Sequence, residues 1–247
     1  MLDVYSLRPE THYGCPAADQ ILINRHYVVG YSYYFRQAKW ALEIVDPDKR
    51  DMNEAERQDD FIVDYRVPKR FRATLEDFEG SGFDRGHLVA SANKQDTQVQ
   101  NNETFLLSNM APQNPRMNRG KWRELESAVR ALDNKKTRAG QRKFLETYVI
   151  SGPIFDFTAR TRFIGQADDN GIEIPIPSHF FKCVLTIDKN NKISMWAFEM
   201  ENKRLSGDLK DYLKSTSYIE QRAGITFWDN LLGNQIEKQK RRIGTMW

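Results

Sequence analysis

Residues 80–92 read GSGFDRGHLVASA, and the expected fold depends on this stretch. Glycines bracket the run DRGH (84–87), which follows a predicted strand over Phe71–Phe78, so we expect a tight turn that presents His87. A lone histidine is more often structural than catalytic, and the chain has only four. His87 therefore needs supporting chemistry elsewhere in the sequence.

Two later motifs supply that support. Residues 108–115 read SNMAPQNP and residues 118–126 read NRGKWRELE, each about thirty residues or less from the motif before it. In this order, the three motifs resemble the DNA/RNA non-specific endonuclease family of ββα-metal nucleases. The resemblance extends to residues 56–59 (ERQD) and 72–74 upstream, and to residues 151–155 (SGPIF) and 218–227 downstream. It covers most of the chain and implies one domain, residues 1–247.

The resemblance implies a fold, an activity and a site. The fold is α+β, with a central antiparallel sheet flanked by helices and a ββα-metal unit. The activity is Mg²⁺-dependent cleavage of DNA and RNA, with Mn²⁺ as a substitute cation. The general base falls on His87, the direct metal ligand on Asn118, and a carboxylate that acts through a metal-bound water on Glu126. The residues expected at the phosphate and the metal's water shell are Arg57, Arg85 and Gln113.

Elementary chemistry agrees with the central assignments. A histidine with an ordinary pKa of about 6.5 accepts a proton from water at neutral pH, whereas a neighbouring lysine or arginine does so only after a large pKa shift. An amide oxygen is a hard ligand that suits Mg²⁺ better than Zn²⁺. On a straight helix, Asn118 and Glu126 are separated by about 12 Å of rise and roughly 80° of rotation, so an indirect role for Glu126 is expected.

Several residues have a structural alternative. Glu126 could be an ordinary helix carboxylate paired with Arg123 or Arg130. The alternative for Arg57 and Arg85 is a buried ion pair rather than a grip on phosphoryl oxygens. Asp84 is expected to fix the turn. Asn109 is expected either to cap a turn or to support the metal site. His179 is expected to be a core or edge residue.

The remaining elements follow from periodicity and turn residues. Aromatic and β-branched runs predict strands at residues 26–35, 39–45, 147–154, 180–187 and 193–200. Apolar residues at helical spacing predict a helix from Asn118 through Leu132. Ser217 and Glu220 suggest a capping box for a short helix that ends at Gly224. The basic residues 238–242 (KQKRR) are interpreted as a solvated tail rather than a phosphate-binding arm.

Bulk properties narrow the class only slightly. A net charge of +3 favours a polyanionic partner weakly. No stretch is apolar enough to span a membrane, and residues 1–9 lack an export-signal pattern. Because many relatives are secreted, periplasmic or mitochondrial, the compartment is secreted or periplasmic only if an export signal was removed. Cys15 and Cys183 exclude a zinc cluster and leave one disulfide open.

The sequence is compatible with three functions. The favoured one is an active nuclease that contacts mainly phosphate and sugar, and so reads no base sequence. The second is a nucleic-acid-binding protein that has lost catalysis. The third is a phosphodiesterase for a small substrate, which would need a closed pocket. The basic residues near the DRGH run instead predict an open groove, and they are Arg66, Lys69, Arg70 and Arg72. The family resemblance also allows a homodimer and leaves any inhibitor protein unidentified.

The chain departs from the family pattern after DRGH. Residues 88–93 read LVASAN where relatives commonly have Met-Ala-Pro. We expect this difference to alter the loop behind His87 and to leave the catalytic positions unchanged.

Overall fold

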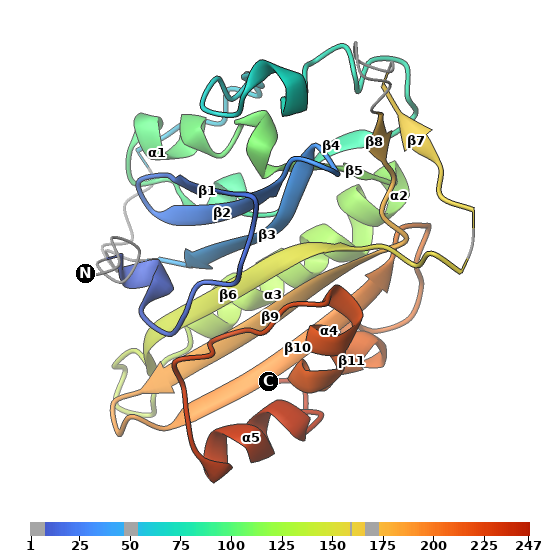
Figure 1. Cartoon of the computed structure of the whole chain (residues 1–247). Helices are drawn as coiled ribbons and strands as arrows, with labels where there is room; N and C mark the ends of the chain where they lie inside the picture. The colour runs from blue at the N-terminus through green and yellow to red at the C-terminus, as the bar shows by residue number, and fades with distance from the viewer. Residues whose placement is uncertain (1–7, 47–53, 159, 166–172) are drawn as a thin grey trace, which may run out of the picture.

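A seven-stranded sheet forms the centre of the molecule. The computed structural model describes residues 8–46, 54–158, 160–165 and 173–247 (Figure 1). The strand order is β1-β2-β3-β6-β9-β10-β11, and each neighbouring pair is antiparallel. The strands are β1 (Gln20–Ile23), β2 (Tyr27–Ser32), β3 (Gln37–Ile44), β6 (Phe144–Ile154), β9 (His179–Asp188), β10 (Ile193–Glu201) and β11 (Leu213–Lys214). The expected antiparallel sheet is confirmed.

Helices cover both faces of this sheet (Figure 1). The amphipathic helix α3 (Arg123–Asp133) lies on one face, where its apolar stripe joins a core that includes Val149 and Val184. The stripe consists of Leu125, Val129 and Leu132, as the spacing predicts, with Trp122 just before the helix. The opposite face is covered by α4 (Thr216–Ala223) and α5 (Asn234–Arg241).

A two-stranded hairpin lies beside the main sheet. Strand β4 (Asp84–His87) pairs antiparallel with β5 (Met110–Gln113), and α1 (Gln98–Glu103) lies in the connection between them. The chain then continues through α2 (Pro115–Met117) and a π-helical turn, η6 (Asn118–Trp122), into α3. This succession of two strands and a helix is the expected ββα unit. The short 3-10 turns are η2 (Pro9–Thr11), η3 (Lys69–Phe71), η4 (Ser91–Asn93), η5 (Leu107–Asn109) and η7 (Leu209–Tyr212).

A second small hairpin packs against β5. It consists of β7 (Phe163–Ile164) and β8 (Ile174–Pro175). Ile164 and Ile174 are buried in one apolar cluster with Met110 of β5 and Phe78. This packing holds the β7–β8 hairpin at the same end of the molecule as the β4–β5 hairpin (Figure 1).

The predicted strand over Phe71–Phe78 is wrong. The segment forms the turn η3 followed by a loop, because the carboxylate of Asp77 accepts hydrogen bonds from the backbone and hydroxyl of Thr74. The same carboxylate pairs with the buried guanidinium of Arg36 at 3.1 Å. The hydrogen bonds of the Asp77 side chain therefore stabilise a turn here, although the apolar residues of the segment favour a strand.

Two predictions near the C-terminus need correction. Helix α4 is capped by Ser215 and not by Ser217, since the Ser215 hydroxyl accepts a hydrogen bond from the backbone of Tyr218. Gly224 ends the helix in the left-handed conformation, as expected. The basic cluster 238–242 lies largely in α5 and is no frayed tail, because the Lys240 ammonium is buried and bonds to Glu220 at 2.8 Å.

Two further findings concern the cysteines and the membrane. Cys15 is half-buried and Cys183 is buried, and no disulfide joins them. Within the described ranges, no helix has the length and apolar character needed to cross a bilayer.

Candidate active site

His87 is the last residue of β4. The DRGH run is thus a strand and not a tight turn, and Gly86 within it explains the close pairing: a Cβ atom there would lie 2.2 Å from the side chain of Gln113. The imidazole packs edge-on against Phe105, at 4.9 Å between ring centroids, with Phe61 at 5.9 Å. Its Nε2 atom is buried and has no partner among the described residues, while the residue as a whole is partly exposed in a cleft.

Burial and charge keep the His87 imidazole neutral. Burial is the main cause that lowers its pKa from 6.5 to about 3, the positive charge of Arg57 acts in the same direction, and Asp59 opposes them. In the neutral ring, the unpartnered Nε2 atom is the one able to accept a proton, so His87 is the candidate general base by its position in the cleft.

The backbone at and after His87 is fixed by hydrogen bonds from Trp122, Lys182 and Asn109. Trp122 donates its Nε1 hydrogen to the carbonyl of His87 at 3.2 Å, and Lys182 donates to the carbonyl of Leu88 at 3.3 Å. Asn109 accepts from the backbone of Val89 at 3.0 Å and donates back to the carbonyl of the same residue. Of the two roles expected for Asn109, capping a turn or supporting the metal site, its bonds to backbone groups fit the first. Helical spacing predicted a buried Trp122, and no sequence pattern predicted the contact of Lys182.

Asn118 begins η6 and faces the same cleft as His87. Its amide nitrogen donates to a carboxylate oxygen of Asp84 at 2.9 Å, so the amide oxygen is the atom left for a cation. Asp84 also holds the Arg119 guanidinium through two bonds, at 2.7 and 2.9 Å. Asp84 was expected to fix a turn, but it lies in β4, and its carboxylate instead orients the neighbouring amide of Asn118 and holds Arg119.

Glu126 lies in the wall of the same cleft. One of its carboxylate oxygens is buried without a partner, and neither Arg123 nor Arg130 forms an ion pair with it in the described structure. Burial raises the pKa of this carboxyl, against the lowering effect of nearby Lys182. The spacing expected from a straight helix does not apply, because Gly120 breaks the helical backbone (φ −107°, ψ −108°) between Asn118 and Glu126.

Arginines make the cleft basic. Arg57 is 53% exposed and pairs with the exposed Asp59 at 2.6 Å, so its ion pair is not a buried structural one. The guanidinium of Arg85 lies over the ring of Phe61 at 5.1 Å, and its Nε atom is buried without a partner. The cleft has a volume of about 490 Å³. Three further arginines that sequence reasoning did not assign to it also line it: Arg119, Arg123 and Arg130.

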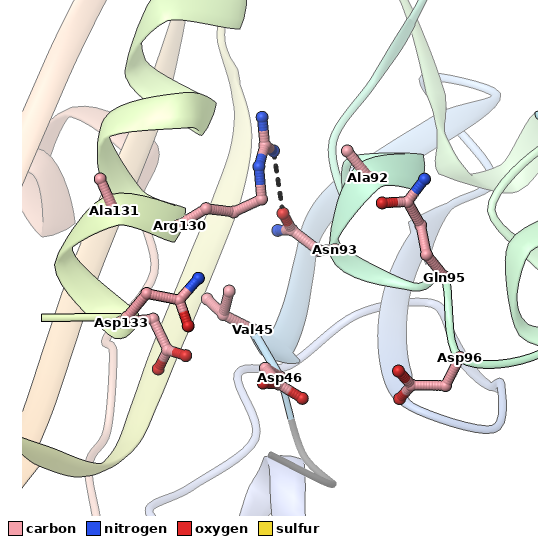
Figure 2. Close-up of a pocket in the computed structure, with 10 residues that line it drawn as sticks. Val45, Asp46, Ala92, Asn93, Gln95, Asp96, Arg130, Ala131 and Asp133 are labelled. Carbon is pink, nitrogen blue, oxygen red and sulfur yellow. Dashed lines mark hydrogen bonds between the residues drawn. The ribbon is translucent and has the colours of Figure 1, made fainter. Parts of the chain in front are cut away.

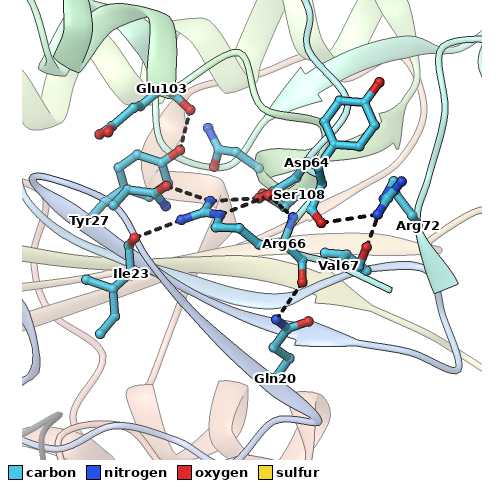
Figure 3. Close-up of polar contacts among 12 residues, drawn as sticks. Gln20, Ile23, Tyr27, Asp64, Arg66, Val67, Arg72, Glu103 and Ser108 are labelled. Carbon is cyan, nitrogen blue, oxygen red and sulfur yellow. Dashed lines mark hydrogen bonds and ion pairs between the residues drawn. The ribbon is translucent and has the colours of Figure 1, made fainter. Parts of the chain in front are cut away.

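Other predicted residues lie elsewhere. Gln113 is fully buried against Gly86, and its side chain does not line the cleft. Arg66 is bound to Asp64 at 2.7 Å in a polar network that joins β1 to the loop after Phe61 (Figure 3). None of Arg66, Lys69, Arg70 and Arg72 lines the cleft that contains His87, so these residues do not form the groove that the sequence predicted. His179 is half-buried at the start of β9 and lies outside the cleft, as expected.

Two neighbouring hollows extend the cleft lined by His87, Asn118 and Glu126, which is called the catalytic cleft below. One, of about 290 Å³, meets it at Arg130, whose guanidinium donates to Asn93 at 3.0 Å (Figure 2). Its carboxylates at Asp46 and Asp133 are paired with Arg142 and make it unsuited to phosphate. The other, of about 460 Å³, shares Arg57, Arg85, Asn118 and Arg119 with the catalytic cleft and adds Phe61 and Phe83.

The donor set at the cleft fits a hard, hydrated cation. In the part of the chain that the structure describes, no cluster of three or more His, Cys, Asp or Glu side chains is placed to hold a metal ion. The oriented amide oxygen of Asn118 would provide a single direct ligand and leave the other positions to water and substrate, an arrangement typical of Mg²⁺. The unpartnered oxygen of Glu126 is available to a metal-bound water.

An antiparallel strand pair, a following helix, and a histidine and an asparagine facing one basic cleft define a ββα-metal nuclease. The family model described as DNA/RNA non-specific endonuclease matches residues 8–234, and the chain belongs to this family. It is therefore a nuclease, an enzyme that hydrolyses phosphodiester bonds.

Named relatives support this assignment. The chain is 33% identical over 229 residues to mitochondrial Endonuclease G of Homo sapiens, covering 89% of this chain and 73% of the relative. It is 32% identical to Nuclease C1 of Cunninghamella echinulata var. echinulata, with 89% and 87% covered. Among solved structures, the EndoG/EndoGI complex, described as showing the mechanism of EndoG inhibition, aligns with a TM-score of 0.80 at 28% identity, covering 93% of this chain and 92% of that one.

Proposed function

We propose that this nuclease is a Mg²⁺-dependent endonuclease that cuts DNA and RNA without base selection, with His87 as general base and Asn118 as the direct metal ligand. The observation that carries the proposal is the shared cleft: His87, Asn118 and Glu126 line one basic hollow although they come from β4, η6 and α3. Mn²⁺ is expected to substitute for Mg²⁺.

Each residue has one task in the proposed reaction. The neutral His87 takes a proton from the attacking water. Arg57 and Arg85 bind phosphoryl oxygens and stabilise the charge that grows on them in the transition state. When bound at Asn118, the cation supplies positive charge beside the leaving oxygen. Glu126 orients a water of the cation's hydration shell.

The proposed lack of base selection follows from contacts that go to phosphates and not to bases. Five of the twelve residues that line the cleft are arginines, and their contacts to phosphates carry no sequence information. Gln113 is not needed for this scheme. By analogy with the EndoG/EndoGI complex, whose description names inhibition of EndoG, an inhibitor protein belongs to the partners proposed for this chain. A homodimer stays a prediction.

The test is loss of supercoiled plasmid and of ribosomal RNA on agarose gels. Wild-type protein with Mg²⁺ should degrade both, while EDTA, His87→Ala and Asn118→Ala should each abolish cleavage. His179→Ala is the matched control, since it removes a half-buried histidine outside the cleft, and it should stay active. Full activity of His87→Ala, or in EDTA, would reject the mechanism.

The two alternatives give different results in the same assay. A binding protein that has lost catalysis would retard the plasmid without cutting it. A phosphodiesterase for small substrates would hydrolyse bis(p-nitrophenyl) phosphate and leave plasmid and RNA intact. The basic and open cleft favours the nuclease over both.

A further inference from the structure

Three phenylalanine rings group on the surface away from the catalytic residues. Phe35, in the β2–β3 turn, stacks on Phe155 at 4.4 Å between centroids, with the planes 20° apart. Phe157 lies beside both rings, at 6.4 and 6.1 Å, and is 68% exposed. Grouped aromatic rings with an open face on a protein surface mark a binding site more often than chance exposure.

Basic groups lie next to these rings. A hollow of about 210 Å³ is lined by Phe155 together with Arg160, Arg162 and Lys203. Glu201 pairs with Lys203, and Asp156 keeps its charge while it accepts two bonds from Thr158, so Arg160 and Arg162 are the basic groups left for a ligand. Arg162 is exposed, and no carboxylate in the described ranges pairs with it. A guanidinium without a carboxylate partner among the described residues, beside the half-buried rings of Phe83 and Phe155, suits a ligand that carries both negative charge and flat apolar faces.

This surface is continuous with the cleft. The guanidinium of Arg162 lies 5.8 Å from the ring centre of Phe83, and Phe83 lines the hollow that shares Arg57 and Arg85 with the catalytic cleft. Arg162 immediately precedes β7, whose Ile164 is buried against Met110 of β5. The hairpin that carries Arg162 is thus packed directly onto the hairpin that carries His87.

We propose that Phe83, Arg162, Phe155 and Phe157, named here the aromatic arm, bind unpaired nucleotides of the substrate strand on one side of the scissile phosphate. The inference rests on the proposed nuclease function and names the substrate form that the site favours. Bases of any identity stack on aromatic rings, and an arginine between the rings neutralises a phosphate. A duplex hides the faces of its bases, so the aromatic arm acts on single strands and on unpaired ends.

Binding and cleavage test the proposal separately. In a His87→Ala background with EDTA, fluorescence anisotropy measures the affinity for a labelled 20-nucleotide oligo(dT), for its 5-nucleotide counterpart, and for a 20-base-pair duplex. Phe157→Ala and Arg162→Ala should each weaken binding of the long single strand about fivefold or more. Binding of the short strand and of the duplex should change less than about twofold. Phe157→Tyr, which keeps the ring, should restore binding.

Matched controls remove the same groups elsewhere. Tyr65→Ala deletes a 74% exposed ring beside an arginine, and Arg138→Ala deletes an exposed arginine, both outside the cleft and the aromatic arm. Neither should alter single-strand affinity. In the active protein, Phe157→Ala should raise KM for long single strands and leave kcat unchanged.

Several outcomes would overturn the proposal. Unchanged single-strand affinity in Phe157→Ala and Arg162→Ala would reject the aromatic arm, even if the wild-type enzyme cuts plasmid. An equal loss of duplex affinity would show a general phosphate contact. A change of oligomeric state in light scattering, with binding unchanged, would assign the rings to a contact with a second copy of the chain. Failure of wild-type protein to cut any nucleic acid would instead reject the proposed function.

Discussion

Asp84 decides which atom of Asn118 faces the cleft. Its carboxylate accepts the Asn118 amide hydrogen at 2.9 Å, which turns the amide oxygen toward the space where a cation would bind. A free amide could rotate and present nitrogen, which repels a cation. In the proposed site, Asp84 would act on the cation through Asn118, as supporting groups around metal sites commonly do.

We predict that Asp84→Ala raises the Mg²⁺ concentration for half-maximal cleavage by about 10-fold to 100-fold, the usual effect of losing such a supporting group. Asp84→Asn should have a smaller effect, because it keeps an oxygen that accepts the Asn118 hydrogen. Arg119→Ala is the control, since it removes the other partner of Asp84 and leaves the Asn118 bond intact. Metal titrations of plasmid cleavage give the comparison, and an unchanged Mg²⁺ requirement in Asp84→Ala would contradict the role.

The environment of His87 predicts an unusual titration. Because burial and Arg57 lower its pKa to about 3, the imidazole should stay neutral as the pH falls through 6.5 to about 4. In NMR spectra, the His87 signals, assigned by their absence in His87→Ala, should not shift over this range. The unfolded chain takes up a proton near pH 6.5 that the folded chain does not, so this residue lowers stability as the pH falls from 6.5 toward 3. A midpoint near 6.5 for His87 would show that the ring is solvated.

The residues proposed to carry the chemistry could be predicted from the sequence more readily than the residues that hold them in place. His87, Asn118 and Glu126 were placed through motifs, and the structure brings them to one cleft. Lys182 could not be predicted, because its contact with the Leu88 carbonyl depends on β9 passing beneath the loop after His87. A contact between residues 94 positions apart leaves no local pattern in the sequence.

At the scale of elements, strands with strong periodicity were predictable. The runs that become β2, β3, β6, β9 and β10 are long and rich in β-branched or aromatic residues, so composition alone finds them. The short strands were missed or misread: β1 has four residues, and β4 was taken for a turn because of its glycine. Pairing with β5 makes DRGH a strand, and that pairing depends on a tertiary fit between Gly86 and Gln113.

This fit gives a prediction about the β4–β5 hairpin. Gly86→Ala should lower the free energy of unfolding by about 1–3 kcal/mol, the usual cost of inserting a methyl group into a packed site. The new Cβ would meet the Gln113 side chain at 2.2 Å. Chemical denaturation of each variant provides the measurement.

The control is Gln113→Ala, combined with Gly86→Ala. Removing the Gln113 side chain opens the space, so the double variant should lose less stability than the sum of the single variants. If the losses simply add, the two side chains do not meet as the structure has them. If Gln113→Ala loses activity without losing stability, Gln113 has the substrate role that its position in SNMAPQNP suggested.

At the scale of the whole molecule, charge is concentrated rather than abundant. The net charge is only +3, yet five arginines line the catalytic cleft. Overall composition could not reveal this, because Asp and Glu elsewhere offset the basic groups. The local field, and not the net charge, should govern binding of nucleic acid.

We therefore predict a marked salt dependence of duplex binding. If the cleft arginines neutralise roughly four phosphates, the logarithm of the binding constant should fall with a slope of about −3 to −4 against the logarithm of KCl concentration. Arg123→Ala should reduce the slope by about 1. Arg70→Ala, which removes an exposed arginine outside the clefts, should leave it unchanged. A slope near zero would show that phosphate contacts do not dominate binding.

The central claim is that the base and the metal ligand serve one cation in one cleft, and paramagnetic broadening tests it most directly. Mn²⁺ added below stoichiometry should broaden the His87 imidazole signals in NMR spectra, because an ion bound at the Asn118 amide would lie beside the ring. Asn118→Ala should remove the broadening while the fold, followed by circular dichroism, stays intact. Sharp His87 signals in wild-type protein with Mn²⁺ bound would contradict the claim.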